Sequence, residues 1–444
     1  MKIVYIVHAV DTEGPLYESL SAKFKRIKDL YGIDIKKRNY TEFKKLLKKK
    51  ILHNNKKINI SDIFSSHLNK YNENWSQLNE MIDEMMTDQF RNKYKDSFND
   101  CYKFTWHCLD HVGFINNPRK RTLGFHKIYD FYKKKITNNK KYGDSIEWHF
   151  HPMSTFKDAN FCATFYFRDP IIYEILCRKI LDRNFFPSSY RAGFQAERPD
   201  SNWFLEQWIP FDITNMSIKN KNHWEKFRDF KNGRSGNWRN APSNWEIYNP
   251  DIRDYQKKGE CKRYIGRALN ILNRIASINQ KEVDSAFKRA DKLNKPVLMG
   301  VASHDWRDLR EEVDFVYKLV KTASKKFKNV KFKFLPVQEA FQKTIFNNKV
   351  KRKLKIKVIK NFKSIKDHPN LIIKTSGCEI FGPQPFLAIK TKNNQYIHDN
   401  FDFIKKNTWG YAFHENTLSL DKVKEIAIAT NDKFGFTYIK KISF

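Results

Sequence analysis

The chain has 444 residues, 40% of them hydrophobic and 15% aromatic, which is enough for two or three folded domains and excludes an intrinsically disordered protein. Lysine and arginine number 84 against 49 aspartates and glutamates, so the formal net charge is +35. Such a field attracts nucleic acid, anionic lipid or acidic glycan, but the lysines are spread over the whole chain, which favours a solvated surface. Because no concentrated basic stripe or nucleic-acid motif accompanies them, we expect no specific nucleic-acid partner.

Two features of the sequence indicate where in the cell the protein is located, namely its cysteines and its N-terminal apolar run. The six cysteines show no CxxC spacing, which favours reduced thiols over a disulfide framework or a zinc module. The N-terminal apolar run is interrupted at once by Asp11 and Glu13, which is untypical of a signal peptide. No uncharged apolar run approaches the ~18 residues that span a bilayer. These features predict a cytoplasmic protein.

Two acids follow the first predicted strand. Lys2–Val10 is a short, β-branched apolar run, and Asp11-Thr12-Glu13-Gly14 comes directly after it. Because side chains alternate along an extended chain, Asp11 and Glu13 project to one side. Two carboxylates this close repel each other unless a metal or an arginine lies beside them. The alternative is a polar loop with two solvated acids.

Residues from about 40 to 100 have helical patterns. The amphipathic stretch Thr41–Leu52 predicts one helix, and Asn59–Asn99 predicts further helix with Ser61 as an N-cap. We interpret this region as a helical insertion between the first strand and the next. The basic face of its first helix suits peripheral association with a membrane, although a solvated face is the simpler interpretation.

Histidines accompany the second predicted strand, Lys103–Leu109. His107 lies within it, and Asp110 and His111 come just beyond it. A group of this kind at a strand end is either a set of metal ligands or, more commonly, a set of substrate-contacting or structural residues.

A second histidine pair lies on the next predicted strand, Asp144–Pro152. Alternation places Glu147, His149 and His151 on one face of this strand. Two histidines separated by one residue converge on a point, which is a familiar metal-chelating arrangement. The alternative is a pair of histidines packed in a half-buried sheet.

Three later segments add candidate residues. Arg191 precedes the small residues Ala192 and Gly193, which let a guanidinium approach a carboxylate on a neighbouring strand. Trp238 and Trp245 lie in a loop-rich stretch and either stack on a sugar or pack under the loop. The buried strand Pro296–His304 delivers His304 at its carboxyl end.

Strands and helices alternate up to about residue 346, which predicts a β/α array with the polar candidates near strand ends. From residue 347 to 444 the pattern changes to short alternating segments separated by turn residues, which predicts a small β-rich domain without a catalytic constellation.

The chain resembles the polysaccharide deacetylase family. Four ordered motifs carry the resemblance: Asp11-Thr12-Glu13, His149-Phe150-His151-Pro152, Arg191-Ala192-Gly193 and His304. The commoner family pattern has adjacent aspartates and three residues between the histidines, whereas one residue separates each pair here. The resemblance implies a distorted (β/α) barrel over residues 1–346, with the helical insertion at about 40–100 and the β-rich domain after it.

The resemblance also implies a function, namely metal-dependent hydrolysis of an N-acyl (acetyl) group on an amino sugar in surface-polysaccharide or glycolipid biosynthesis. Glu13, His149 and His151 would hold zinc or another divalent metal. Asp11 would be the general base, oriented by Arg191, and His304 the general acid. The remaining candidates would contact the substrate: Glu147, His107, His111, Trp238 and Trp245. The alternative is an inactive, deacetylase-like protein that binds glycan or another anionic partner.

Overall fold

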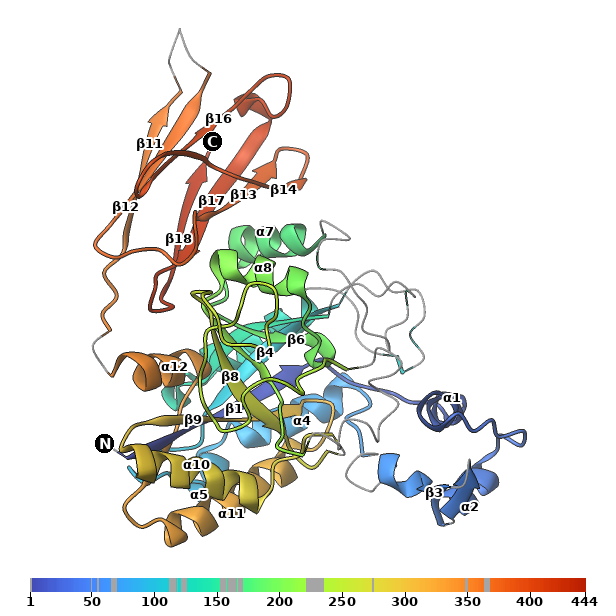
Figure 1. Ribbon diagram of the computed structural model, residues 1–444. Helices are drawn as coiled ribbons and strands as arrows, with labels where there is room; N and C mark the ends of the chain where they lie inside the picture. Colours follow the sequence, from blue (N-terminus) through green and yellow to red (C-terminus); the bar gives the residue numbers. More distant parts are fainter. Residues whose placement is uncertain are drawn as a thin grey trace.

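The computed structural model describes residues 2–48, 50–53, 56–64, 70–111, 117, 119–120, 126–151, 157, 166, 171–220, 235–273, 275–347, 350–362 and 368–444. Its centre is a closed barrel of seven parallel strands (Figure 1). In spatial order these are β1 (Ile3–Thr12), β4 (Phe104–His111), β5 (Ser145–His151), β6 (Ser189–Ala192), β7 (Phe211–Asn215), β8 (Tyr264–Asn270) and β9 (Val297–His304).

Pairing of β9 with β1 closes the ring, and β10 (Lys331–Phe334) adds a further parallel strand beside β1. The register brings the ends of neighbouring strands level: Asp11 lies opposite His107 on one side and His304 on the other. The expected α/β barrel is therefore confirmed, and the polar strand ends meet at one rim.

Helices cover the outside of the barrel because each has one apolar face. These helices are α6 (Lys127–Asn138), α7 (Ile171–Arg183), α8 (Pro199–Trp208), α10 (Gln280–Leu293), α11 (Leu309–Lys326) and α12 (Val337–Phe346). In α10 the buried residues Val283, Phe287 and Ala290 recur at helical spacing, and the side chain of Asn279 caps the helix by accepting from the N–H of Glu282. Among the described helices, none is both long and apolar enough to cross a bilayer.

The segment between β1 and β4 differs in part from the helical insertion expected from its sequence. It contains α1 (Leu20–Tyr31), α2 (Tyr40–Lys48), the hairpin β2 (Lys50–His53) and β3 (Lys56–Asn59), a 3₁₀ turn at Ile60–Ile63, α4 (Trp75–Met85) and α5 (Asp88–Lys93). α1 and α2 share a small core of their own with the 3₁₀ turn, and they project to one side of the barrel (Figure 1).

Two details of that prediction were wrong. The helix predicted over Thr41–Leu52 ends at Lys48, because Ile51 pairs with Ile58 across the hairpin, a contact that a helical period cannot foresee. Ser61 lies within the 3₁₀ turn and caps no helix; Asn74 and Thr87 cap α4 and α5 instead.

The C-terminal region is β-rich, as predicted, and forms two antiparallel four-stranded sheets. One has the order β11 (Lys355–Asn361), β12 (Asn370–Ser376), β16 (Thr408–Ala412), β15 (Asp402–Lys405). The other has the order β14 (Tyr396–Asp399), β13 (Phe386–Thr391), β17 (Val423–Asn431), β18 (Thr437–Ser443).

Alternation along β13 explains how this region docks. Leu387 and Ile389 point into the core between the two sheets, whereas Phe386 and Ala388 pack with residues of α7 and α8 on the barrel. The second sheet is thus buried on both faces, and the sandwich lies directly over these helices (Figure 1).

A buried ion pair fixes the end of the insertion to the barrel. Both nitrogens of the Arg91 fork on α5 donate to Asp144, at 2.8 and 2.7 Å, just before β5. Asp144 also accepts from the N–H of Phe104 and from the indole of Trp106. Since both charged side chains are almost wholly buried, each depends on the other for its compensation.

We predict that Asp144→Ala lowers the free energy of unfolding by about 3–5 kcal/mol, because Arg91 is left as an uncompensated buried charge. Urea unfolding followed by circular dichroism measures the change. Lys141→Met is the matched control: it breaks the exposed pair with Asp88 and should leave the midpoint almost unchanged. Equal midpoints for the two variants would contradict a structural role for the buried pair.

Candidate metal centre

A buried carboxylate and guanidinium form the base of the site. Asp11 lies near the end of β1, and Nε of Arg191 on β6 donates to its two oxygens at 2.7 and 3.0 Å. The Nη1 group of Arg191 donates to the carbonyl of Ile213 at 2.8 Å, which fixes the guanidinium plane. The predicted approach of Arg191 to an acid at a strand end is therefore present in the structure.

The two histidines at the end of β5 converge, as their alternation predicts. Their Nε2 atoms lie 3.1 Å apart. The Nδ1 atom of His149 lies 2.8 Å from the carbonyl oxygen of Arg191. Because a carbonyl oxygen can only accept, Nδ1 carries the hydrogen, and Nε2 of the neutral ring presents a lone pair towards His151.

Glu13 completes a group of three donors. Its Oε1 atom lies 3.6 Å from Nε2 of His151 and 4.0 Å from Nε2 of His149. Candidate ligand atoms of the three residues all lie within 4.8 Å of one another, and all three residues are buried. In the described part of the chain this is the one group of its kind.

The donor set fits a divalent first-row metal. Two imidazole nitrogens and one carboxylate oxygen are ligands that zinc takes in catalytic sites, with a further position open for water or substrate. Nitrogen ligands at zinc–nitrogen distances of 2.0–2.1 Å in a tetrahedral site are separated by about 3.3 Å. The observed separation of the His149 and His151 nitrogens is close to that value. The structure therefore supports a possible metal site at Glu13, His149 and His151.

His304 faces this group from the end of β9. Its Nε2 atom lies 3.8 Å from Oδ2 of Asp11 and 3.7 Å from Oε1 of Glu13. The His304 side chain is 15% exposed, whereas Asp11 and Glu13 are 0% and 4% exposed. It packs against the ring of Trp306 with centroids 4.8 Å apart. His304 is thus the most accessible of these side chains.

Asp305 holds the turn that carries Glu13, a role that sequence reasoning missed. Its carboxylate accepts from the N–H of Glu13 at 2.8 Å, from the N–H of Gly14 at 3.0 Å and from the hydroxyl of Tyr132 at 2.9 Å. Burial raises the pKa of Asp305 well above its usual range, while the hydrogen bonds oppose that shift. The sequence signal was an acid directly after His304, but its partners lie far away in the chain.

His107 and His111 lie on β4 beside the site. His107 is fully buried. Burial, and then the charge of Arg191, lower the pKa of His107 well below its usual value. His111 packs its ring 4.5 Å from that of His151, and burial lowers its pKa to about 3. Both are therefore neutral residues behind the three donors, and substrate contact by either stays a prediction.

Glu147 does not join the three donors. Its carboxylate accepts from the N–H and hydroxyl of Ser188 and from the N–H of Ser189, at the start of β6. Burial raises the pKa of Glu147 to about 7. It lies two residues nearer the start of β5 than His149, so it supports the base of the barrel and reaches no metal ligand.

Trp238 and Trp245 are buried under the loops that carry them. The indole of Trp238 donates to the carbonyl of Gln195 at 2.8 Å and packs against Tyr255. The indole of Trp245 donates to Ser285 at 2.8 Å and stacks on Arg267. Both therefore have the packing role that was the alternative to sugar stacking. Pro152, the last residue of the histidine motif, lies outside the described residues.

Searches of protein-family models, curated proteins and solved structures gave no match for this chain.

We predict that the purified protein binds close to one equivalent of zinc or a similar divalent metal, and that His149→Ala/His151→Ala removes it. Elemental analysis of protein prepared without chelator measures the content. His368→Ala/His414→Ala, which removes two neighbouring histidines of the C-terminal region, is the matched control and should keep the metal. Equal metal content in the two double variants would place any bound metal elsewhere.

Asp305→Ala should weaken metal binding by about 10- to 100-fold, because Glu13 loses the anchor of its backbone. Tyr132→Phe removes only the hydroxyl that donates to Asp305 and should have a much smaller effect. Competition against a chromogenic zinc chelator gives both dissociation constants. Unchanged affinity in Asp305→Ala would show that the turn holds its position without this carboxylate.

Proposed function

We propose that the protein is a metal-dependent amide hydrolase that removes an N-acetyl or related N-acyl group from an amino sugar. The observation that carries this proposal is the convergence of Glu13, His149 and His151 beside the Asp11–Arg191 pair and His304. All these side chains lie at the carboxyl ends of barrel strands, where enzymes of this architecture place their reacting groups. The resemblance to polysaccharide deacetylases supports the substrate class.

The metal and its ligands have a defined task in this proposal. When bound by Glu13, His149 and His151, a divalent metal supplies a Lewis acid that polarises the acyl oxygen and makes water more acidic. The hydrogen bond from His149 to the Arg191 carbonyl keeps the Nε2 lone pair directed at the site. Asp305 holds the backbone of Glu13 and so keeps its carboxylate in place.

Asp11 is placed to act as the general base. Its oxygens lie 3.7 Å from Nδ1 of His149 and 3.8 Å from Nε2 of His304, so it lies between the metal ligands and the proposed acid. Arg191 donates to both oxygens and fixes the carboxylate plane. In this proposal Asp11 takes a proton from the attacking water as the new carbon–oxygen bond forms.

His304 is placed to act as the general acid. It is the most exposed of the side chains that converge at the rim, so a substrate can reach it, and its Nε2 atom lies within 4 Å of the carboxylates of Asp11 and Glu13. It donates a proton to the sugar nitrogen as the carbon–nitrogen bond breaks. The acyl group then leaves as a carboxylate and the sugar keeps a free amine.

The alternative, an inactive protein that only binds glycan, has less support. Each chemical role of the proposed reaction has a competent side chain at the rim, whereas a binding protein needs neither a buried general base nor three converging metal ligands. We propose a cytoplasmic amino-sugar glycan or lipid-linked glycan precursor as the substrate, in surface-polysaccharide or glycolipid biosynthesis. Cell fractionation that places the protein outside the cytoplasm would overturn that choice of substrate.

We predict that Asp11→Asn and His304→Ala each lower kcat for amide hydrolysis by about 10²- to 10⁴-fold, because each removes one proton-transfer group. Acetate release from a panel of N-acetylated oligosaccharides and glycolipid precursors measures the rate. His414→Ala, at an exposed histidine of the C-terminal region, is the control and should keep full activity.

Metal content separates the possible outcomes of that experiment. His304→Ala should keep its metal, because His304 is not one of the three ligands. Full acetate release by Asp11→Asn or His304→Ala would contradict the proposed roles. A wild-type protein that holds metal but releases acetate from none of these substrates would favour the binding alternative.

A further inference from the structure

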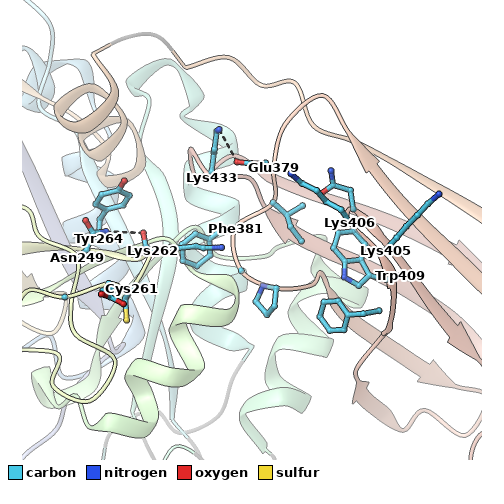
Figure 2. A pocket seen from close by; sticks show the side chains of 17 residues that line it. Asn249, Cys261, Lys262, Tyr264, Glu379, Phe381, Lys405, Lys406, Trp409 and Lys433 are labelled. Carbon is cyan, nitrogen blue, oxygen red and sulfur yellow. Dashed lines mark hydrogen bonds and ion pairs between the residues drawn. The ribbon is translucent and has the colours of Figure 1, made fainter.

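A hollow lies far from the metal centre, between the barrel and the C-terminal sheets. Its volume is about 750 Å³. Asn249, Lys262 and Tyr264 of the barrel line one side of it, and residues from the turn before β13 and from β15 and β16 line the other (Figure 2). Tyr264 begins β8, so the hollow lies near the amino ends of the barrel strands. Asp11 and His304 lie at the opposite ends of theirs.

Close packing fixes the walls of this hollow. Gly382 has a φ of +81°, and a Cβ added there would lie 1.8 Å from the carbonyl oxygen of Gln207 on α8. The neighbouring Phe381 donates its N–H to Asn431 at 2.8 Å. The Asn431 side chain in turn donates to the carbonyl of Trp208 at 2.9 Å. The turn at 379–383 is thus held against the barrel, and the hollow is preformed.

Positive charge is concentrated in the hollow. Four lysines line it against two glutamates, Glu260 and Glu379. Lys433 pairs with Glu379 at 3.2 Å, as the dashed line in Figure 2 shows. The other lysines, Lys262, Lys405 and Lys406, are exposed; the charges of Lys262 and Lys406 add to that of Lys433 in lowering the pKa of Glu379, which leaves an excess of positive charge. A concave surface with an excess of cations focuses a positive potential and attracts anions.

Aromatic groups lie among these lysines. Phe403 on the edge strand β15 is 64% exposed, and both Phe403 and Lys405 line the hollow. Trp409 on β16 lies opposite Phe403 in the register and also lines the hollow. Trp409 is 3% exposed and packs in the core of the C-terminal sheets, so it forms part of the wall behind Phe403.

We propose that this hollow is an accessory site for an acidic glycan. Lys262, Lys405 and Lys406 bind carboxylate, sulfate or phosphate groups on the sugar. Phe403 contacts the apolar C–H face of a sugar ring. The choice of a glycan over another anion rests on the proposed function. The excess of positive charge and the exposed ring of Phe403 are features of the structure that do not depend on that function.

The position of the site defines its role. The seven residues of β8 span about 23 Å, so a sugar in the hollow lies far from the metal ligands. The site therefore binds a long glycan at a distance from its reacting group and raises the local concentration of substrate. It contributes affinity, and it takes no part in the proton transfers.

Isothermal titration calorimetry on the full chain tests this proposal with oligogalacturonate and a heparin hexasaccharide as acidic probes. A neutral maltohexaose is the uncharged control. We expect both acidic probes to bind, with an affinity that falls as salt rises, and the neutral probe not to bind. Lys405→Gln/Lys406→Gln and Phe403→Ala should each weaken binding by about tenfold.

A charge-matched double variant separates this site from the diffuse basic surface. Lys355→Gln/Lys357→Gln removes two exposed lysines from β11, at the opposite edge of the same sheet, and should leave the affinity unchanged. Equal losses in the two lysine pairs, or no binding of either acidic probe, would overturn the proposal. Binding to phosphatidylglycerol vesicles that is lost in Lys405→Gln/Lys406→Gln, without binding of the acidic probes, would assign the hollow to a membrane surface instead.

The metal-ligand variant keeps this test separate from the proposed activity. His149→Ala/His151→Ala should bind the acidic probes as tightly as the wild type. Binding of the acidic probes by a wild-type protein that hydrolyses no amide would reject the proposed enzyme and keep the accessory site. Loss of binding in a folded His149→Ala/His151→Ala variant would show that the probes occupy the barrel rim and would overturn the proposal.

Discussion

Pairing of β1 with strands on both sides is the constraint on which the site depends. β4 and β9 flank β1 in parallel register, so Asp11 lies level with His107 and His304. The carbonyl of Asp11 accepts from the N–H of Asp305, and the Asp305 carboxylate in turn holds the next turn of chain. The same pairing of β1 with β9 thus closes the barrel and brings Asp305 to the turn that carries Glu13. A shift of β1 by one residue would turn Asp11 to the other face of its strand.

Burial of charged side chains at this rim costs desolvation free energy, and the fold could form without them. Asp11 and Arg191 are both fully buried, and such a pair commonly stabilises a fold no better than apolar residues of the same size. Buried histidines and a carboxylate in the same place add to that cost. A set of polar groups that converges without benefit to folding is typical of a functional site. The Arg91–Asp144 pair differs, because it fixes the insertion to the barrel and lies outside the group of candidate metal ligands.

Much of the rim could be predicted from sequence because its signals are local. β1 and β9 are apolar runs that end in polar residues, and alternation along β5 correctly paired His149 with His151. β8 was missed because Gly266, Arg267 and Asn270 interrupt its apolar pattern; Gly266 lies there because a Cβ would approach the ring of Phe341 to 2.8 Å. Asp305 and the β2–β3 hairpin depend on partners distant in the chain. Alternation also grouped Glu147 with the histidines, but it says nothing of how far along the strand a side chain lies.

Two imidazoles and a carboxylate at the rim of the barrel could hold a divalent metal ion, and we propose that they bind one. X-ray absorption spectroscopy of the zinc-loaded protein tests this proposal most directly, because the fine structure counts imidazole ligands. We expect two imidazoles and otherwise oxygen ligands at about 2.0–2.2 Å, with one imidazole left in His149→Ala. Sulfur ligands, or an imidazole count that His149→Ala leaves unchanged, would contradict a metal site at these residues.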